Sequence, residues 1–363
     1  MDRARWPYLP NYAVPPGAIL CERLEDLGMT QSELARRMGR SEAKISQIIN
    51  GSRSITPETA LQLERTVGTS AETWLSLQAG YDANRARLAG RDRLLREEGA
   101  VAARFPYAEM ARRGWVPDTR RPIERIEQLL AYMGVASLLA EGGKPAPAMF
   151  RVARCGEPSQ CALAAWLRWG QIEGREATMA SFSQRSLQRA LPELRGLTQQ
   201  DPTRCVDHLR TVLAGCGVAL VIVPALKGTH VQGATQWLAR DRAVVQLSGR
   251  CKWADVFWFD LFHELGHLLL HDKAGEVFVR FTDERDNDER ETEADQFAQD
   301  ILIPAQQWQR LLDLAPYNAA RIRRFATESA VGAGVVVGRL QHEREVPRNR
   351  FNDLRVLCNW GAT

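Results

Sequence analysis

The chain has 363 residues, of which 45% are hydrophobic and 25% charged, a composition typical of a soluble globular protein with two or three domains. The longest apolar run, residues 218–223, is far too short to span a bilayer, and the first residues lack the apolar core of a secretion signal, so we expect a cytoplasmic protein without a membrane partner. Seven scattered cysteines without a C-x-x-C pair exclude a disulfide framework, and a net charge of +4 permits nucleic-acid binding without requiring it.

The first 80 residues are predicted to form an extended arm, residues 1–16, and then five helices. Thr30-Gln31-Ser32-Glu33 is a capping box, in which the threonine side chain accepts the backbone N–H of the glutamate, and Gly39 ends the helix that it opens. Ser41 is expected to cap the next helix in the same way. The predicted helices are residues 16–27, 31–38, 42–50, 57–68 and one from about residue 71.

Two short helices joined by a tight glycine turn, inside a five-helix unit, predict a helix-turn-helix domain that binds double-stranded DNA. The recognition helix would begin after Ser41, and three isoleucines, Ile45, Ile48 and Ile49, would hold it to the core. Gln47 is placed to read a base edge, and Arg53 to contact a phosphate. The predicted DNA contacts are Gln31, Ser41, Lys44, Ser46, Gln47, Asn50 and Arg53.

The run T-Q-S-E-L-A-R-R-M-G-R-S-E-A-K-I-S-Q-I-I-N-G, residues 30–51, resembles the Xre and phage-repressor helix-turn-helix. A longer stretch, about residues 14–87, is similar to HigA-type antitoxin repressors. The resemblance implies a DNA operator as partner, a homodimer on paired half-sites and, in an antitoxin, a toxin partner.

Residues 81–204 are predicted to be a helical spacer. The arginine-rich segment 80–125 is expected to form a long connecting helix and linker, and residues 141–147 a loop. Further helices are predicted at residues 122–139, 161–172, 183–191 and 205–213.

The pattern changes after residue 217 to short segments rich in valine and isoleucine. Residues 218–223 predict a buried strand, and residues 234–239 and 243–247 predict a hairpin that turns at residues 240–242. A helix over residues 260–271 follows directly. A small sheet followed by such a helix is the minimal layout of a zincin, the fold of many zinc peptidases.

The helix 260–271 reads D-L-F-H-E-L-G-H-L-L-L-H and contains the motif H-E-x-x-H, although the chain has only 6 histidines. Because residues i and i+4 share one helix face, His263 and His267 can bind one Zn²⁺ ion. Glu264 lies beside them and is placed to accept a proton from the attacking water. The motif therefore predicts zinc-dependent peptide-bond hydrolysis.

A third zinc ligand is predicted in the acidic segment 289–298. Glu291 and Asp295 share a helix face, so Glu291 would bind zinc and Asp295 would hold the ring N–H of a ligand histidine. Glu293 is excluded because it lies about 200° around the helix from Glu291. His271 could be a further ligand or a substrate contact, but three histidines in one row extend along about 12 Å of helix axis, so we interpret it as a supporting neighbour. His230 is a candidate donor to the oxyanion of the reaction.

The segments F-H-E-L-G-H-L-L-L-H, E-T-E-A-D-Q-F-A and I-L-I-P resemble the ImmA/IrrE metallopeptidase family over about residues 205–310. The resemblance implies a compact zinc peptidase whose members act on phage-type or stress-response repressors, and it favours Glu291 as the third ligand. The tail, residues 311–363, is predicted to be helical and has no assigned chemistry.

The sequence thus predicts a mainly α chain with a small α+β domain. The expected domains are a helix-turn-helix domain (1–80), a spacer (81–204), a zincin-like peptidase domain (205–310) and a helical extension (311–363). The predicted function is a DNA-binding transcriptional regulator whose zinc endopeptidase domain cleaves a repressor, a partner or its own chain. The alternative is a HigA-like antitoxin or repressor whose zincin domain is a non-hydrolytic sensor or scaffold.

Overall fold

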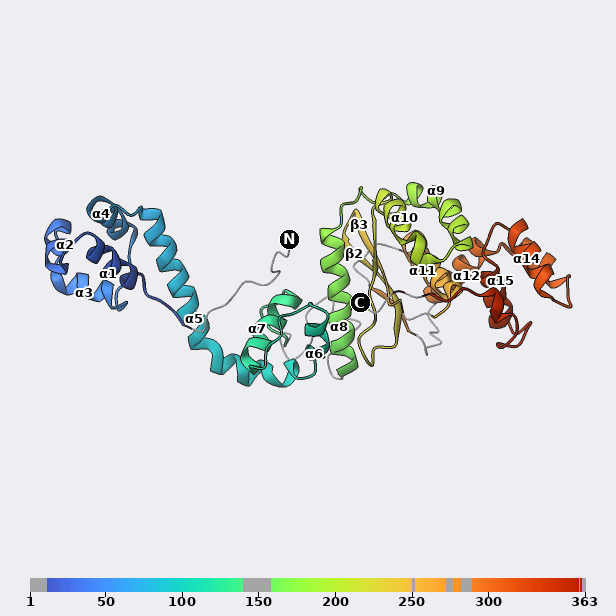
Figure 1. Ribbon diagram of the computed structural model, residues 1–363, viewed down its shortest axis with the longest axis horizontal. Helices are drawn as coiled ribbons and strands as arrows, with labels where there is room; N and C mark the ends of the chain where they lie inside the picture. The colour runs from blue at the N-terminus through green and yellow to red at the C-terminus, as the bar shows by residue number, and fades with distance from the viewer. Residues whose placement is uncertain are drawn as a thin grey trace. The chain divides into compact units, whose positions relative to one another are not determined.

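The computed structural model describes residues 12–139, 158–249, 252–271, 277–281, 289–358 and 360. Its described part is mainly helical with one mixed four-stranded sheet, which confirms the predicted fold class (Figure 1). The chain forms two compact units, one of residues 1–99 with 121–126 and the other of residues 100–120 with 127–363. Most of the predicted arm 1–16 and the whole predicted loop 141–147 lie outside the described residues. No described helix is both long and apolar enough to cross a membrane.

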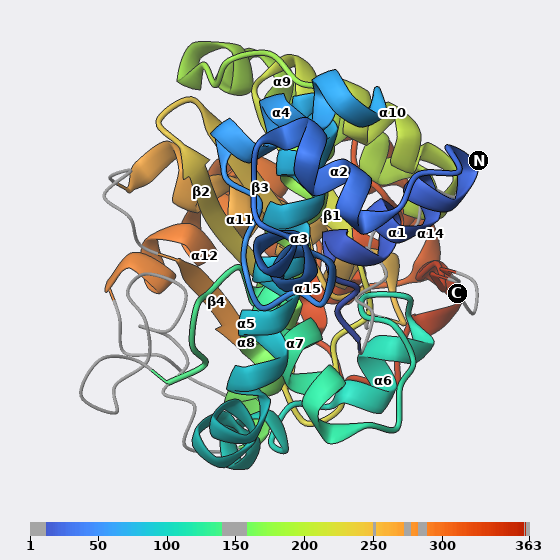
Figure 2. The same cartoon turned by 90° about the vertical axis from the view of Figure 1, so that its left-hand side faces the viewer.

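The first unit is a bundle of short helices followed by one long helix (Figures 1 and 2). The predicted helices are present with nearly the expected bounds. Their shared core contains side chains with no exposed surface, including Leu20, Leu34, Ile45, Leu63 and Trp74. The helices are α1 (Pro16–Asp26), α2 (Gln31–Met38), α3 (Glu42–Ile49), α4 (Pro57–Val67) and α5 (Ala71–Ala102).

The caps of these helices agree with the sequence at α2 and differ at α3. Thr30 Oγ1 accepts the Glu33 N–H at 3.1 Å, and Gly39 ends α2 in the left-handed conformation with φ 62°. The predicted side-chain cap by Ser41 is wrong. The N–H of Lys44, which that hydroxyl would bind, donates instead to the Ser41 carbonyl oxygen at 3.0 Å. The α3 turn closes through backbone alone.

The second unit is built around the sheet, whose strand order is β1-β3-β2-β4. Strands β1 and β3 pair in parallel, and β2 and β3 form the predicted antiparallel hairpin. Strand β4 was not predicted; it is short and pairs antiparallel with the edge of β2. The strands are β1 (Val218–Ile222), β2 (Val231–Ala239), β3 (Arg242–Leu247) and β4 (Phe278–Phe281).

Helices cover both faces of this sheet. Figure 1 shows α8 (Pro158–Glu176) on one side and α10 (Pro202–Gly215) and α11 (Ala254–Leu270) on the other. Helix α11 begins six residues before its predicted start, and nearly all its side chains are buried because α12 (Glu289–Leu302) and α15 (Ala333–His342) also pack on it. A helix that is buried on nearly every side is one enclosed by other elements.

The remaining elements of the chain's described part are helical, and α7 (Pro122–Met133) is shared between the two units. The predicted helix 122–139 ends early, because Gly134 takes a left-handed φ of 70° directly after it. The additional helices are α6 (Tyr107–Arg112), α7 (Pro122–Met133), α9 (Gln184–Gly196), α13 (Ala305–Leu312) and α14 (Ala319–Glu328), with short 3-10 turns η2 (Leu197–Gln199) and η3 (Asn352–Leu354).

The helical prediction for the tail is wrong after α15. There the chain forms turns and the 3-10 turn η3, and residues 356–358 then pair with residues 252–254 at the start of α11. The Ala254 N–H donates to the Val356 carbonyl oxygen, and the Cys358 N–H donates to the Lys252 carbonyl oxygen, both at 2.9 Å. These contacts hold the N-terminal end of α11, which periodicity in the tail alone could not reveal.

Candidate metal centre

Three side chains from two helices converge in the second unit. His263 and His267 lie one turn apart on α11, with their Nε2 atoms 3.0 Å apart. Glu291, in the first turn of α12, faces both: its Oε2 lies 3.0 Å from His263 Nε2 and its Oε1 lies 3.3 Å from His267 Nε2. Each of the three residues offers one ligand atom, and these three atoms all lie within 4.8 Å of one another. The structure therefore brings together the three side chains that the sequence predicts as ligands.

Small residues let α11 and α12 approach closely enough for this. A Cβ on Gly266 would lie 3.0 Å from Phe297 Cδ1 and 3.3 Å from the Cα of Ala294. A larger side chain in place of Gly266 or Ala294 would push the two helices apart. The glycine inside H-E-L-G-H therefore sets the helix spacing that places Glu291 opposite the histidines.

The carboxylate of Glu291 is held in its charged form beside the two imidazole rings. Burial lowers the pKa of His263, but hydrogen bonds to Asp295 and Glu291 outweigh it and raise that pKa to about 9. Burial also lowers the pKa of His267. Burial tends to raise the pKa of Glu291, but its bonds to the two histidines hold it well below the usual range. Two imidazole nitrogens and an ionised carboxylate that face one another are a donor set suited to a divalent metal ion.

Glu264 is fully buried beside this cluster. Burial raises the pKa of its carboxyl group to about 7. Thr235, on β2, donates its hydroxyl to Glu264 Oε2 at 2.6 Å, whereas no described group bonds to the equally buried Oε1. A Cβ on Gly233 would lie 2.4 Å from that Oε1, so only glycine leaves room for the carboxylate. Glu264 thus keeps one unsatisfied oxygen in the interior, which is expensive unless a further polar group occupies the site.

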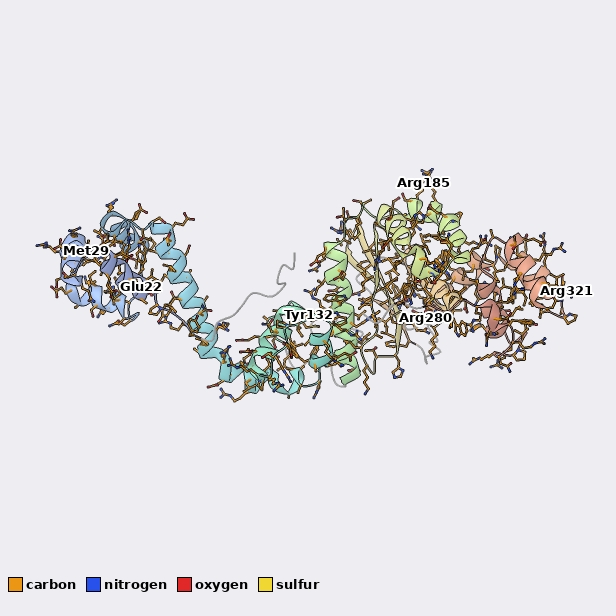
Figure 3. All side chains as sticks on the ribbon, in the orientation of Figure 1. Glu22, Met29, Tyr132, Arg185, Arg280 and Arg321 are labelled. Atoms are coloured by element: carbon orange, nitrogen blue, oxygen red, sulfur yellow. The ribbon has the colours of Figure 1, made fainter. Side chains whose placement is uncertain are left out.

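Asp295 and Arg280 form a charged pair beside Nδ1 of His263, the ring nitrogen that faces away from Glu291. Asp295 Oδ1 lies 2.8 Å from His263 Nδ1, the contact expected from the sequence. Arg280, on β4 and labelled in Figure 3, places Nη1 2.6 Å from that same Asp295 oxygen. The same Nη1 also lies 2.6 Å from His263 Nδ1, and Asp260 lies 3.6 Å from Arg280 Nε. Sequence reasoning missed Arg280, Asp260 and Thr235. Only the alternation in F-V-R-F, which suggests a short strand, could have pointed to Arg280.

Comparison with known proteins identifies both parts of the chain. Residues 22–74 match the family model "Helix-turn-helix", and residues 227–341 match "IrrE N-terminal-like domain", a peptidase family. The Escherichia coli K12 protein "Uncharacterized HTH-type transcriptional regulator YddM" is 35% identical over 66 residues, which are 18% of this chain and 70% of that protein. The chain belongs to the helix-turn-helix regulators and carries an IrrE-like peptidase domain.

Other relatives match the same N-terminal region. "Virulence-associated protein I" of Dichelobacter nodosus is 39% identical over 71 residues, which cover 19% of this chain and 66% of its own length. A HigA-family addiction module antidote protein from Coxiella burnetii is 37% identical, with 23% of this chain and 94% of that chain covered and a TM-score of 0.22. The Pseudomonas aeruginosa antitoxin HigA, solved with the higBA promoter, is 30% identical. The match covers 24% of this chain and 95% of that chain, with a TM-score of 0.22.

In this helix-turn-helix regulator, all seven side chains predicted to contact DNA are exposed. They lie at the start of α2, along α3 and in the turn that follows it. Asn50 is partly engaged, because its Oδ1 accepts the N–H of Ser52 at 3.2 Å and its hydroxyl at 2.7 Å. Their roles in DNA binding stay predictions.

The two other histidines singled out in the regulator's sequence lie in different places. His271 follows the end of α11 with extended backbone; its Nδ1 is 3.0 Å from His267 Nδ1, and its Nε2 is 3.0 Å from Glu293 Oε2. It therefore contacts His267 rather than joining the three converging side chains. His230 is exposed just before β2, with φ 50°, and is not one of the three. Its role as an oxyanion donor stays a prediction.

Proposed function

We propose that this regulator binds operator DNA as a homodimer and uses zinc at His263, His267 and Glu291 to cleave a peptide bond in a repressor, a partner protein or its own chain. The proposed roles follow the predicted domains: residues 1–80 bind DNA, residues 81–204 connect the two functions, and residues 205–310 carry the metal centre. Residues 311–363 form an extension to which no chemistry is assigned.

The observation that carries the hydrolytic part is Glu264 with its unsatisfied oxygen. A carboxyl group with a pKa near 7 can both accept and release a proton at neutral pH, which is what a general base that later acts as a general acid must do. Thr235 holds the other oxygen, so the free Oε1 has a fixed position. A purely structural glutamate would have both oxygens satisfied.

Each residue of the proposed site has one role in the hydrolysis. Zinc bound by the three converging side chains would polarise a scissile carbonyl and acidify a water molecule. Glu264 would take the proton of the attacking water and pass it to the leaving amine. Asp295 and Arg280 would keep the His263 ring in the orientation that turns Nε2 toward Glu291.

The DNA-binding part is supported by the family match and by the exposed outer face of α3. Gln47 would contact a base edge from the middle of α3, and Arg53 would contact a phosphate from the turn beyond it. An antitoxin role with a toxin partner would use this same unit, while a regulatory protease would use both units.

The decisive experiment compares wild-type protein with Glu264→Gln. Each zinc-loaded protein is incubated with an extract of cells that lack the gene, and newly formed protein N-termini are identified by mass spectrometry. We expect the wild type to produce a small set of new termini and Glu264→Gln to produce none, while both bind zinc equally. The matched control, Glu345→Gln, changes an exposed glutamate of the same unit and should cleave as the wild type does.

If the wild type and Glu264→Gln yield the same termini, or neither yields any, the hydrolytic proposal is wrong. The HigA-like reading, with the zincin domain as a sensor or scaffold, would then stand, and zinc binding would still be measurable.

A further inference from the structure

A cavity of about 400 Å³ lies beside the metal centre. It is lined by α11, α12 and α15, by Gln232 of β2 and Arg280 of β4, and by Arg348 and Arg355 of the segment after α15, but not by His263, His267 or Glu291. Its size falls within the range of small-molecule sites. Asp295 and Arg280, which support His263 from behind, also line it, so the cavity adjoins the side of His263 that faces away from Glu291.

Each acidic group that lines the cavity already has a cationic neighbour. Arg355 makes a two-pronged contact with Asp255, at 2.9 and 2.7 Å, and both side chains are at least nine-tenths buried. Arg280 lies within 4 Å of both Asp295 and Asp260. A cationic ligand would therefore find no spare carboxylate in the lining.

A positive charge remains at the rim. Arg348 and His342 line the cavity and are exposed, and neither side chain has a hydrogen-bond or ion-pair partner within the part of the chain that the structure describes. The neighbouring Arg339, by contrast, is held by Glu343 at 2.7 Å and by the Ile303 carbonyl at 2.7 Å. The exposed lining residues are thus a guanidinium and an imidazole with spare hydrogen-bond donors, which suits an anion.

The wall between these polar groups is apolar. Leu302 and Val335 are buried, and Phe259 is partly buried beside them. A ligand that fills this space must carry an apolar body of a few carbon atoms together with an anionic head. Inorganic phosphate would leave the apolar wall unfilled.

We propose that this cavity is an effector site for a small aliphatic carboxylate. The carboxylate contacts Arg348 and His342, and the hydrocarbon chain packs between Phe259, Leu302 and Val335. Because the cavity shares Arg280 and Asp295 with the support of His263, occupancy changes the affinity of the metal centre for zinc. This site does not depend on peptide hydrolysis, and only its effector action depends on the zinc centre.

The test is calorimetric titration of the full-length, zinc-loaded protein with butanoate, hexanoate and octanoate. We expect saturable binding of at least one of them, with the alcohol and amine of the same chain length at least about tenfold weaker, as loss of a charge-assisted contact predicts. Arg348→Gln should weaken binding of the carboxylate by about tenfold or more, and Gln299→Trp, which adds bulk on the α12 side of the cavity, should abolish it.

Matched controls place the same changes outside the cavity. Arg310→Gln and Gln306→Trp alter exposed positions on α13 and should bind as the wild type does. Circular dichroism and zinc content establish that each variant is folded. Glu264→Gln should also bind normally, so failure of the proposed hydrolysis leaves this test intact.

The carboxylate site is wrong if none of the three acids binds at millimolar concentration, if the amine binds equally well, or if Arg348→Gln and Gln299→Trp leave binding unchanged. The effector action is tested separately by competition with a zinc chelator. A saturating carboxylate should shift the zinc dissociation constant by about fivefold or more, within the usual range of coupling between sites, and an unchanged constant would overturn that action.

Discussion

The helix-turn-helix unit and the metal-centre unit are stabilised over different distances along the chain. In the first, the α2 cap joins Thr30 to Glu33, and the whole core comes from residues 20–74. In the second, His263 meets Asp295, and Asp255 meets Arg355, a separation of 100 residues. Local rules of capping and periodicity therefore describe the first unit well. The chemistry of the second depends on contacts that form only when its helices and sheet have packed.

The largest effect is expected at the metal centre itself. His263→Ala removes one of three converging side chains, so zinc content should fall from about one per chain to nearly none. Thermal unfolding of the first unit should be unchanged, because its core contains no residue of the metal centre. Metal analysis and differential scanning calorimetry measure both. Full zinc retention by the variant would contradict the assignment.

A core truncation in the first unit should show the converse. Trp74 has no exposed surface, and Trp74→Ala should destabilise that unit by about 3–5 kcal/mol, through lost burial and the cavity left behind. Operator binding should weaken through unfolding, while zinc content stays at the wild-type level. Loss of zinc in this variant would show that the two units fold as one.

A smaller effect is expected from the support of His263. Asp295→Asn keeps the shape but removes the charge, and zinc affinity should fall about 10- to 100-fold. Asp300→Asn, an exposed position on the same helix, is the matched control. Equal zinc affinities of the two variants, measured by chelator competition, would show that Asp295 does not act through His263.

The smallest effects compare two caps in the first unit. Thr30→Ala should cost about 1 kcal/mol of stability, since it deletes a side-chain bond to the Glu33 N–H. Ser41→Ala should cost at most a few tenths, because the Ser41 hydroxyl makes no cap bond. Chemical denaturation of both variants measures the difference, and equal losses would contradict the cap geometry described for α3.

Much of the first unit could be predicted from the sequence because its signals are local. Thr30, Gly39 and Pro57 mark helix ends through rules that involve only neighbouring residues. The Ser41 cap failed because two acceptors, the hydroxyl and its own carbonyl, compete for the Lys44 N–H, and the sequence does not choose between them. In the structure the Lys44 N–H donates to the Ser41 carbonyl oxygen, and the Ser41 hydroxyl makes no cap bond.

For the metal centre, helix periodicity alone predicts which residues can meet. The spacing of His263 and His267 and that of Glu291 and Asp295 place each pair on one helix face wherever those helices lie. The H-E-x-x-H motif also specified Glu264 as the acid–base candidate. These predictions need only helix periodicity and the chemistry of the side chains.

The environment of those residues depends on how the elements pack together. Arg280 reaches Asp295 because β4 joins the sheet edge, and Glu264 has a pKa near 7 because β2 and the packed helices exclude water from it. Burial and dielectric surroundings depend on chain segments far apart in sequence, so no local pattern encodes them. The cavity beside the metal centre arises for the same reason, where the tail folds back onto the N-terminal end of α11.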